Sequence, residues 1–100
     1  MNFAEALSQD RRLAILRLLV EANGDANESV LRDGLTMLGH TSGLTFDAVR
    51  EDLRFLEGAG LIRLEFVQVK IAVAHITRRG VEVAKGAATV EGVKKPSLGE

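Results

Sequence analysis

The fold is decided by residues 45–67, whose sequence is TFDAVREDLRFLEGAGLIRLEFV. Thr45 is a suitable helix N-cap. Apolar residues follow it at the spacing of one helical face: Phe46, Val49, Leu53 and Leu56. Gly58-Ala59-Gly60 ends the helix, and residues 61–67 alternate between apolar and polar side chains. The segment therefore predicts a helix followed directly by a β-strand.

Two more helices are predicted before this segment. Residues 3–22 have helical periodicity, either as one helix or as two helices with a break near Gln9. Residues 24–28 are expected to form a turn, in which Asn27 caps a second helix that runs to about Leu38. The charged side chains of the first helix are expected on its solvent side: Arg11, Arg12, Arg17 and Glu21.

After this segment, residues 71–76 (IAVAHI) predict a second strand, with a turn somewhere within residues 67–70. Thr77 is a suitable cap for a short last helix that ends near Lys85. In that helix, Val81 and Ala84 are expected to face inward.

The element order is that of a winged helix-turn-helix domain, mainly α with a small β-hairpin. It would have a three-helix core, a two-stranded wing and a short C-terminal helix. We expect this domain to cover residues 1–86, followed by a partly ordered tail over residues 87–100.

Composition indicates an ordinary globular domain. The 100 residues are 46% hydrophobic and 27% charged, which suits one core. No apolar run approaches the ~18 residues of a membrane span. The N-terminus has no basic segment followed by an apolar one, as a signal peptide would. We therefore expect a cytoplasmic protein.

The sequence contains no pattern typical of catalysis or of a bound cofactor. It has no nucleophile elbow, Walker loop or dinucleotide glycine motif. It has no cysteine, and His40 and His75 stand far apart without further ligand spacing. We expect no enzyme activity, no cofactor and no metal.

Net charge gives a mixed indication. At −1 it is unlike the strongly basic charge of many nucleic-acid-binding domains. Residues 1–57 have six basic and ten acidic side chains, a net charge of −4, whereas residues 58–100 have seven and four, a net charge of +3. The second part can therefore supply a local positive surface.

Three segments resemble ArsR-type winged-helix regulators. Residues 7–19 (LSQDRRLAILRLL) are similar to the start of the first core helix of that family. Residues 53–62 (LRFLEGAGLI) are similar to the end of its recognition helix, and residues 76–80 (ITRRG) to the segment after the wing. Metal-sensing members use cysteine clusters, which this chain lacks, so metal sensing is not implied.

The chain also resembles, over nearly its full length, a family of small uncharacterised proteins from Mu-like prophages. This resemblance includes residues 27–31 (NESVL), 77–80 (TRRG) and 88–96 (ATVEGVKKP). It implies a prophage origin.

A recognition helix in the major groove presents its exposed residues to bases and phosphates, and a wing contacts the backbone. The predicted DNA-binding residues are Thr45, Asp47, Arg50, Arg54, Arg63, Lys70, Arg78 and Arg79. The alternative explanation for Arg50 and Arg54 is pairing on a solvated helix face with Asp47 and Glu51, three residues before them.

Two functions of different classes follow. The first is a DNA-binding transcriptional regulator of prophage genes, with double-stranded DNA as partner. By resemblance to ArsR-like proteins it would be a homodimer through the first and last helices, involving Phe3, Leu7, Val81 and Ala84. The second is a winged-helix module for protein–protein interaction in phage assembly or host takeover, which the acidic third helix favours. A continuous basic patch would favour DNA.

Overall fold

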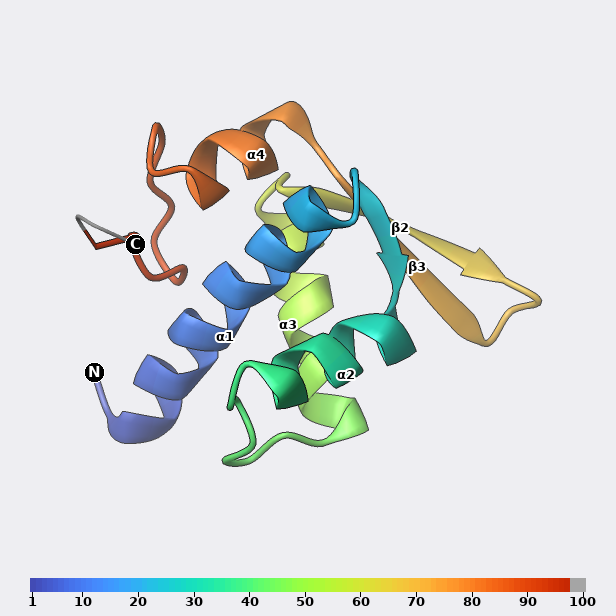
Figure 1. The fold of residues 1–100 in the computed structure, drawn as a ribbon, viewed down its shortest axis with the longest axis horizontal. Helices are drawn as coiled ribbons and strands as arrows, with labels where there is room; N and C mark the ends of the chain where they lie inside the picture. The colour runs from blue at the N-terminus through green and yellow to red at the C-terminus, as the bar shows by residue number, and fades with distance from the viewer. Residues whose placement is uncertain (98–100) are drawn as a thin grey trace.

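Each helix begins at a side chain that caps its first turn. The computed structural model describes residues 1–97, and in them the predicted caps Asn27, Thr45 and Thr77 each accept a backbone N–H, at 2.8, 2.9 and 3.1 Å. Asn2 does the same for the first helix at 2.8 Å. The described elements follow in this order (Figure 1): α1 (Phe3–Glu21), β1 (Asp25–Asn27), α2 (Glu28–Met37), α3 (Phe46–Gly58), β2 (Ile62–Val67), β3 (Ile71–Ile76) and α4 (Arg78–Ala84).

The first segment forms one continuous helix, α1, without a break at Gln9. It ends at Glu21, and Asn23 and Gly24 follow with positive φ angles of 63° and 115° that turn the chain away from the helix. α1 contacts α2, α3, α4 and β3, so its middle is buried on several sides. No helix within residues 1–97 is long and apolar enough to cross a membrane.

The sheet contains a strand where the sequence predicts only a turn. β1 pairs antiparallel with β3, with Asp25 opposite His75, so the strand order is β1-β3-β2. The predicted two-stranded hairpin is therefore part of a three-stranded sheet. β1 has no β-branched or aromatic residue to mark it, and its pairing with β3 holds it as a strand. The β2–β3 hairpin projects from the helices (Figure 1).

The apolar stripe of α3 is confirmed for Val49, Leu53 and Leu56, which are buried. The prediction is wrong for Phe46, whose side chain is 61% exposed. As the first residue of the helix it lies at the edge of the core, and its ring stacks on the guanidinium of Arg32, 3.8 Å away.

The last helix differs in one detail from its prediction. Ala84 is buried as expected, but Val83 is the second buried residue, whereas Val81 is half-buried. The valine that faces the core is therefore adjacent to Ala84 in sequence and not three residues before it.

A buried ionic cluster connects α1 to α3. Asp52 of α3 is 1% exposed, and its carboxylate accepts hydrogen bonds from Nε of Arg11 at 2.5 Å and from Nε of Arg12 at 3.0 Å. Arg11 is itself 7% exposed, so the expectation that it lies on the solvent side of α1 is wrong. Hydrophobic periodicity alone does not reveal a charged residue whose partner is 41 positions away.

The segment after α4 returns along α1, on the side opposite the hairpin (Figure 1). Val93 is buried in the core, and the backbone N–H of Lys94 donates to the carbonyl of Gln9 at 3.1 Å. The carbonyl of Gly92 accepts from Nη1 of Arg12 at 3.0 Å. Residues 98–100 of the predicted tail lie outside the described residues.

Carboxylates cover the backbone on both sides of the hairpin. On β2, the N–H of Leu64 points away from β3 and donates to Oε2 of Glu57 at 2.9 Å. On β3, the N–H of Ala72, beyond the end of β1, donates to the carboxylate of Glu28. Backbone groups that a further strand would use are thus already occupied at these two positions.

Gly80 should be essential for the packing of α4. A Cβ at this position would overlap the carbonyl oxygen of Leu61 and lie 2.7 Å from Cγ1 of Ile76. We expect Gly80→Ala to lower the free energy of unfolding by about 1–3 kcal/mol or more, because the backbone must move to admit the methyl group. Chemical denaturation measures this change.

Gly58→Ala is the matched control. A Cβ at Gly58, the last residue of α3, has no atom within 4 Å, so this variant should be up to about 1 kcal/mol more stable. Equal stability of the two variants would contradict the assigned packing of α4.

Candidate binding surface

The exposed side of α3 contains three of the predicted DNA-binding residues. The Thr45 hydroxyl accepts a backbone N–H of the first turn and so serves the helix itself. Asp47 and Arg54 are exposed. Glu51 and Glu57 are exposed as well, so the acidic side chains outnumber the basic ones on this side of α3.

Arg50 is committed to a contact within the protein. Its Nε and Nη2 donate to the two carboxylate oxygens of Glu28 on α2, at 2.9 and 2.5 Å. The guanidinium also lies 5.3 Å from the ring centroid of Phe66 on β2. The arginine therefore joins α3 to α2 and the hairpin, and its hydrogen-bond partner is Glu28 instead of the Asp47 considered from sequence.

The pairing shifts the pKa of both groups. The hydrogen bond from Arg50 lowers the pKa of Glu28, against the opposing effect of burial, and the Ala72 N–H lowers it further. The same bond raises the pKa of Arg50. Both groups are therefore charged at neutral pH, and the bidentate geometry is the strong form of such a pair.

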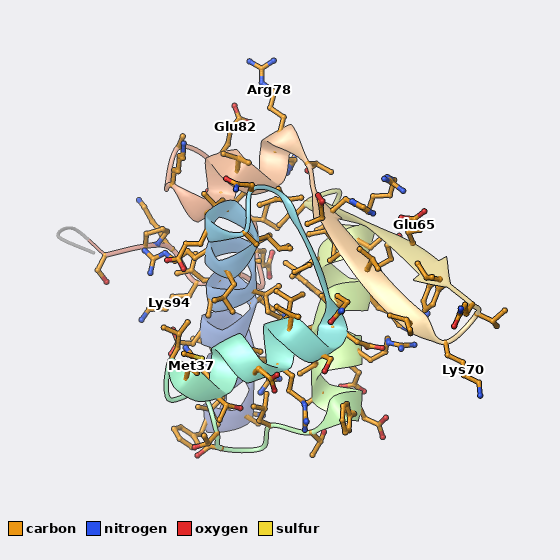
Figure 2. The ribbon with its side chains drawn as sticks, turned by 45° about the vertical axis from the view of Figure 1, so that its right-hand side comes forward. Met37, Glu65, Lys70, Arg78, Glu82 and Lys94 are labelled. Atoms are coloured by element: carbon orange, nitrogen blue, oxygen red, sulfur yellow. The ribbon has the colours of Figure 1, made fainter. Side chains whose placement is uncertain are left out.

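The basic residues of the hairpin and of α4 do not all gather in one place. Arg63, Lys70, Arg78 and Arg79 are all exposed. Lys70 precedes β3 and Arg78 follows it, so six residues of extended chain, about 20 Å, separate them. Figure 2 shows Arg78 at the top of the molecule and Lys70 well apart from it, at the far end of the hairpin. The predicted residues therefore do not form one compact basic patch.

The tip of the hairpin is apolar, and of its residues the sequence analysis identified only Lys70 as a candidate site residue. Val67 and Ile71 form a cross-strand pair, and both are exposed. Val69 is exposed as well, and at 88% it is the most exposed large hydrophobic residue within residues 1–97. Gln68 and Val69 make the turn with positive φ angles of 53° and 67°. In the sequence, this tip is indicated by apolar residues on both sides of a turn that contains no glycine.

Left-handed backbone is uncommon for any residue but glycine and is an outlier for a β-branched one. Val69 therefore combines backbone strain with a fully presented apolar side chain. Both features concentrate at binding sites. We define the hairpin tip as Val67, Gln68, Val69, Lys70 and Ile71.

The two histidines have different surroundings. His75 is a residue of β3, the central strand of the sheet. Its Nε2 lies 2.9 Å from Oε1 of Glu65 on β2, and its Nδ1 lies 3.8 Å from Oδ1 of Asp25 on β1. His40 lies in the loop between α2 and α3. Within residues 1–97, no group of three His, Cys, Asp or Glu side chains is arranged to hold a metal ion.

The residues expected at a dimer surface differ in their accessibility. Phe3 is exposed, Leu7 and Val81 are half-buried, and Ala84 is buried in the core. Among these four residues, only Phe3, at the N-terminal end of α1, thus presents a large apolar side chain on the surface.

The Glu28–Arg50 pair should give pH-dependent stability. Because its pKa is lower in the folded chain, Glu28 contributes stability above its unfolded pKa of about 4.5 that is lost as pH falls through the folded value. Glu28→Gln should lower the free energy of unfolding by about 1–3 kcal/mol at pH 7, with a smaller difference at low pH.

Denaturation at pH 7 and near pH 3 measures this difference. Glu51→Gln is the control, since Glu51 is exposed on α3 and has no ion pair with the described part of the chain. A difference between Glu28→Gln and the parent that is the same at both pH values would contradict the assigned pair.

Comparison with known proteins finds relatives of this chain in a bacterium and in a phage. The chain is 46% identical over 79 residues to an uncharacterised protein of Haemophilus influenzae, covering 79% of this chain and 76% of that protein. It is 41% identical over 92 residues to the uncharacterised protein gp26 of Escherichia phage Mu, covering 92% and 93%. No family model and no solved structure matches the chain. The chain therefore belongs to the family of uncharacterised proteins that includes gp26 of phage Mu and its Haemophilus relative, in agreement with the Mu-like prophage family that the sequence resembles.

Proposed function

We propose that this protein is a winged-helix module that binds another protein through the hairpin tip. In this interpretation α2 and α3 are the helix-turn-helix, and the β2–β3 hairpin is the wing. The order of the elements and the projection of the hairpin from the helices support it (Figure 1). The fold itself does not select the ligand, so the argument rests on the surface.

The apolar, strained hairpin tip carries the proposal. Exposed valine and isoleucine side chains at a fixed turn suit insertion into an apolar pocket of a partner protein, where burial of each would be favourable by about 1.5–3 kcal/mol. The left-handed backbone at Gln68 and Val69 turns the chain so that Val69 stands at the end of the hairpin.

Charge argues for a protein ligand over DNA. The exposed side of α3 is net acidic, and Arg50 is held by Glu28. A helix in the major groove lies close to phosphates, where acidic side chains are repelled. Lys70 is the one basic residue of the hairpin tip.

DNA binding by a transcriptional regulator remains the second candidate, and one observation favours it. Arg54 is exposed on α3 and makes no ion pair with the rest of residues 1–97. Arg63, Arg78 and Arg79 add exposed positive charge around the base of the hairpin. These residues could contact phosphates if the duplex approached the C-terminal end of α3.

Fluorescence anisotropy with random-sequence duplex DNA, repeated over a range of salt concentrations, separates the two candidates. If the chain is a protein-binding module, we expect no DNA binding that strengthens steeply as the salt concentration is lowered. Salt-sensitive binding that disappears after charge reversal at Arg54, Lys70 and Arg79 would establish the DNA function and overturn our proposal.

The hairpin tip can be tested with two variants of equal exposure. Val69 and Met37 are 88% and 87% exposed, and Met37 lies on α2, away from the hairpin (Figure 2). We expect Val69→Asp to reduce the amount of partner protein that the chain captures, from the cells that express it, by about tenfold or more. Losses of a hot-spot residue at an interface are of this size. Met37→Asp should leave capture unchanged.

Aspartate tolerates the left-handed conformation better than valine, so Val69→Asp should fold normally, as circular dichroism would confirm. If quantitative mass spectrometry found the same enriched proteins with the parent and with Val69→Asp, the hairpin tip would not be the contact surface.

A further inference from the structure

A polar pocket lies on the other side of the molecule from the hairpin. It is about 430 Å³ in volume and is formed by α1, the loop between α2 and α3, and the segment after α4. Its polar lining comprises Asp10, Arg11, His40, Thr41, Ser42 and Lys94. Lys94 lies beside α1 (Figure 2). The volume is within the range of small-molecule sites.

Arg11 gives this pocket a buried cation with unused hydrogen-bonding capacity. The side chain is 8% exposed, yet it lines the pocket. Nε donates to Asp52, and Nη2 donates to the Ser8 hydroxyl at 3.3 Å. Nη1 has no hydrogen-bond partner within residues 1–97. It is not fully enclosed by the protein, so it is accessible from the surface.

The charge around Arg11 is not balanced by the protein. Asp52 is shared between Arg11 and Arg12, so two guanidinium groups face a single carboxylate and the cluster has a net charge of +1. A buried charge without full compensation is costly, and a bound anion would reduce this cost. The same groups would be less favourable for a cation.

The other side chains complete an anion-binding arrangement. Lys94 adds a second cation, with its Nζ 3.6 Å from Oδ1 of Asp10 in an exposed pair. Asp10 is the carboxylate that opposes an anion here. The charges of Asp10 and Lys94 offset each other, so the excess positive charge at the pocket is that of the Arg11 cluster. Thr41 and Ser42 supply exposed hydroxyl donors, and the ring of His40 lies at the same wall.

We propose that this pocket binds a small molecule through a phosphate group. Arg11 and Lys94 would supply charge-assisted hydrogen bonds to its oxygens, and Thr41 and Ser42 would supply neutral ones. The ligand would cross-link the loop before α3 to α1. Through Arg11 and Asp52 the bound ligand would also act on the position of α3, as an effector does. This proposal does not depend on what the hairpin tip binds.

Titration of the full chain with sodium phosphate, followed by amide NMR shifts, tests the site. Sodium chloride at matched ionic strength is the reference. We expect saturable shifts concentrated at residues 39–42 and around Lys94. A parallel titration with adenosine monophosphate shows whether an organic body adds affinity to that of the phosphate group.

Lys94→Ala and Lys95→Ala form a matched pair, because Lys95 is the exposed neighbour that does not line the pocket. Lys94→Ala should raise the dissociation constant for phosphate by about tenfold, as expected for one charge-assisted hydrogen bond, and Lys95→Ala should leave it unchanged. Equal weakening in both variants, or shifts that chloride reproduces, would overturn the proposal. Neither result bears on the DNA or capture experiments.

Discussion

The carboxylate of Asp52 connects three parts of the chain that are distant in sequence. It holds α3 against α1 through Arg11 and Arg12, and Arg12 extends the connection to Gly92 in the last segment. The ring of Phe55, 3.9 Å from the Arg12 guanidinium, packs on the same arginine. Loss of one partner would leave an uncompensated charge in the core, which typically costs 3–5 kcal/mol. The crossing of α1 and α3, on which the position of the hairpin depends, is thus fixed by directional bonds as well as by apolar packing.

Most of the fold could be predicted, because its signals are local. Caps such as Thr45, the stripe of α3 and the strand at residues 71–76 depend only on neighbouring residues. The parts that could not be predicted depend on partners far along the chain. β1 exists through β3, nearly 50 residues later, and Arg11 is buried because Asp52 meets it. A local pattern contains no information on such partners.

The candidate site was less predictable than the fold. The residue types on α3 were identified, but whether an arginine is available depends on its surroundings, and Glu28 of another helix holds Arg50. The apolar hairpin tip was visible in the sequence as part of two strands. Its exposure became clear only from the left-handed turn at Gln68 and Val69, which puts Val69 at the end of the projection. Position along a hairpin decides whether an apolar side chain belongs to a core or to a surface.

The carboxylates of Glu57 and Glu28 have a consequence for how copies of this protein behave in a crowded solution. Each occupies a backbone N–H on a side of the hairpin where an extended chain could otherwise add as a new strand. Open sheet edges are the usual starting points for fibrous aggregation, and charged side chains at those edges prevent it. The apolar tip can therefore stand at the end of the sheet without further strands adding at these two positions.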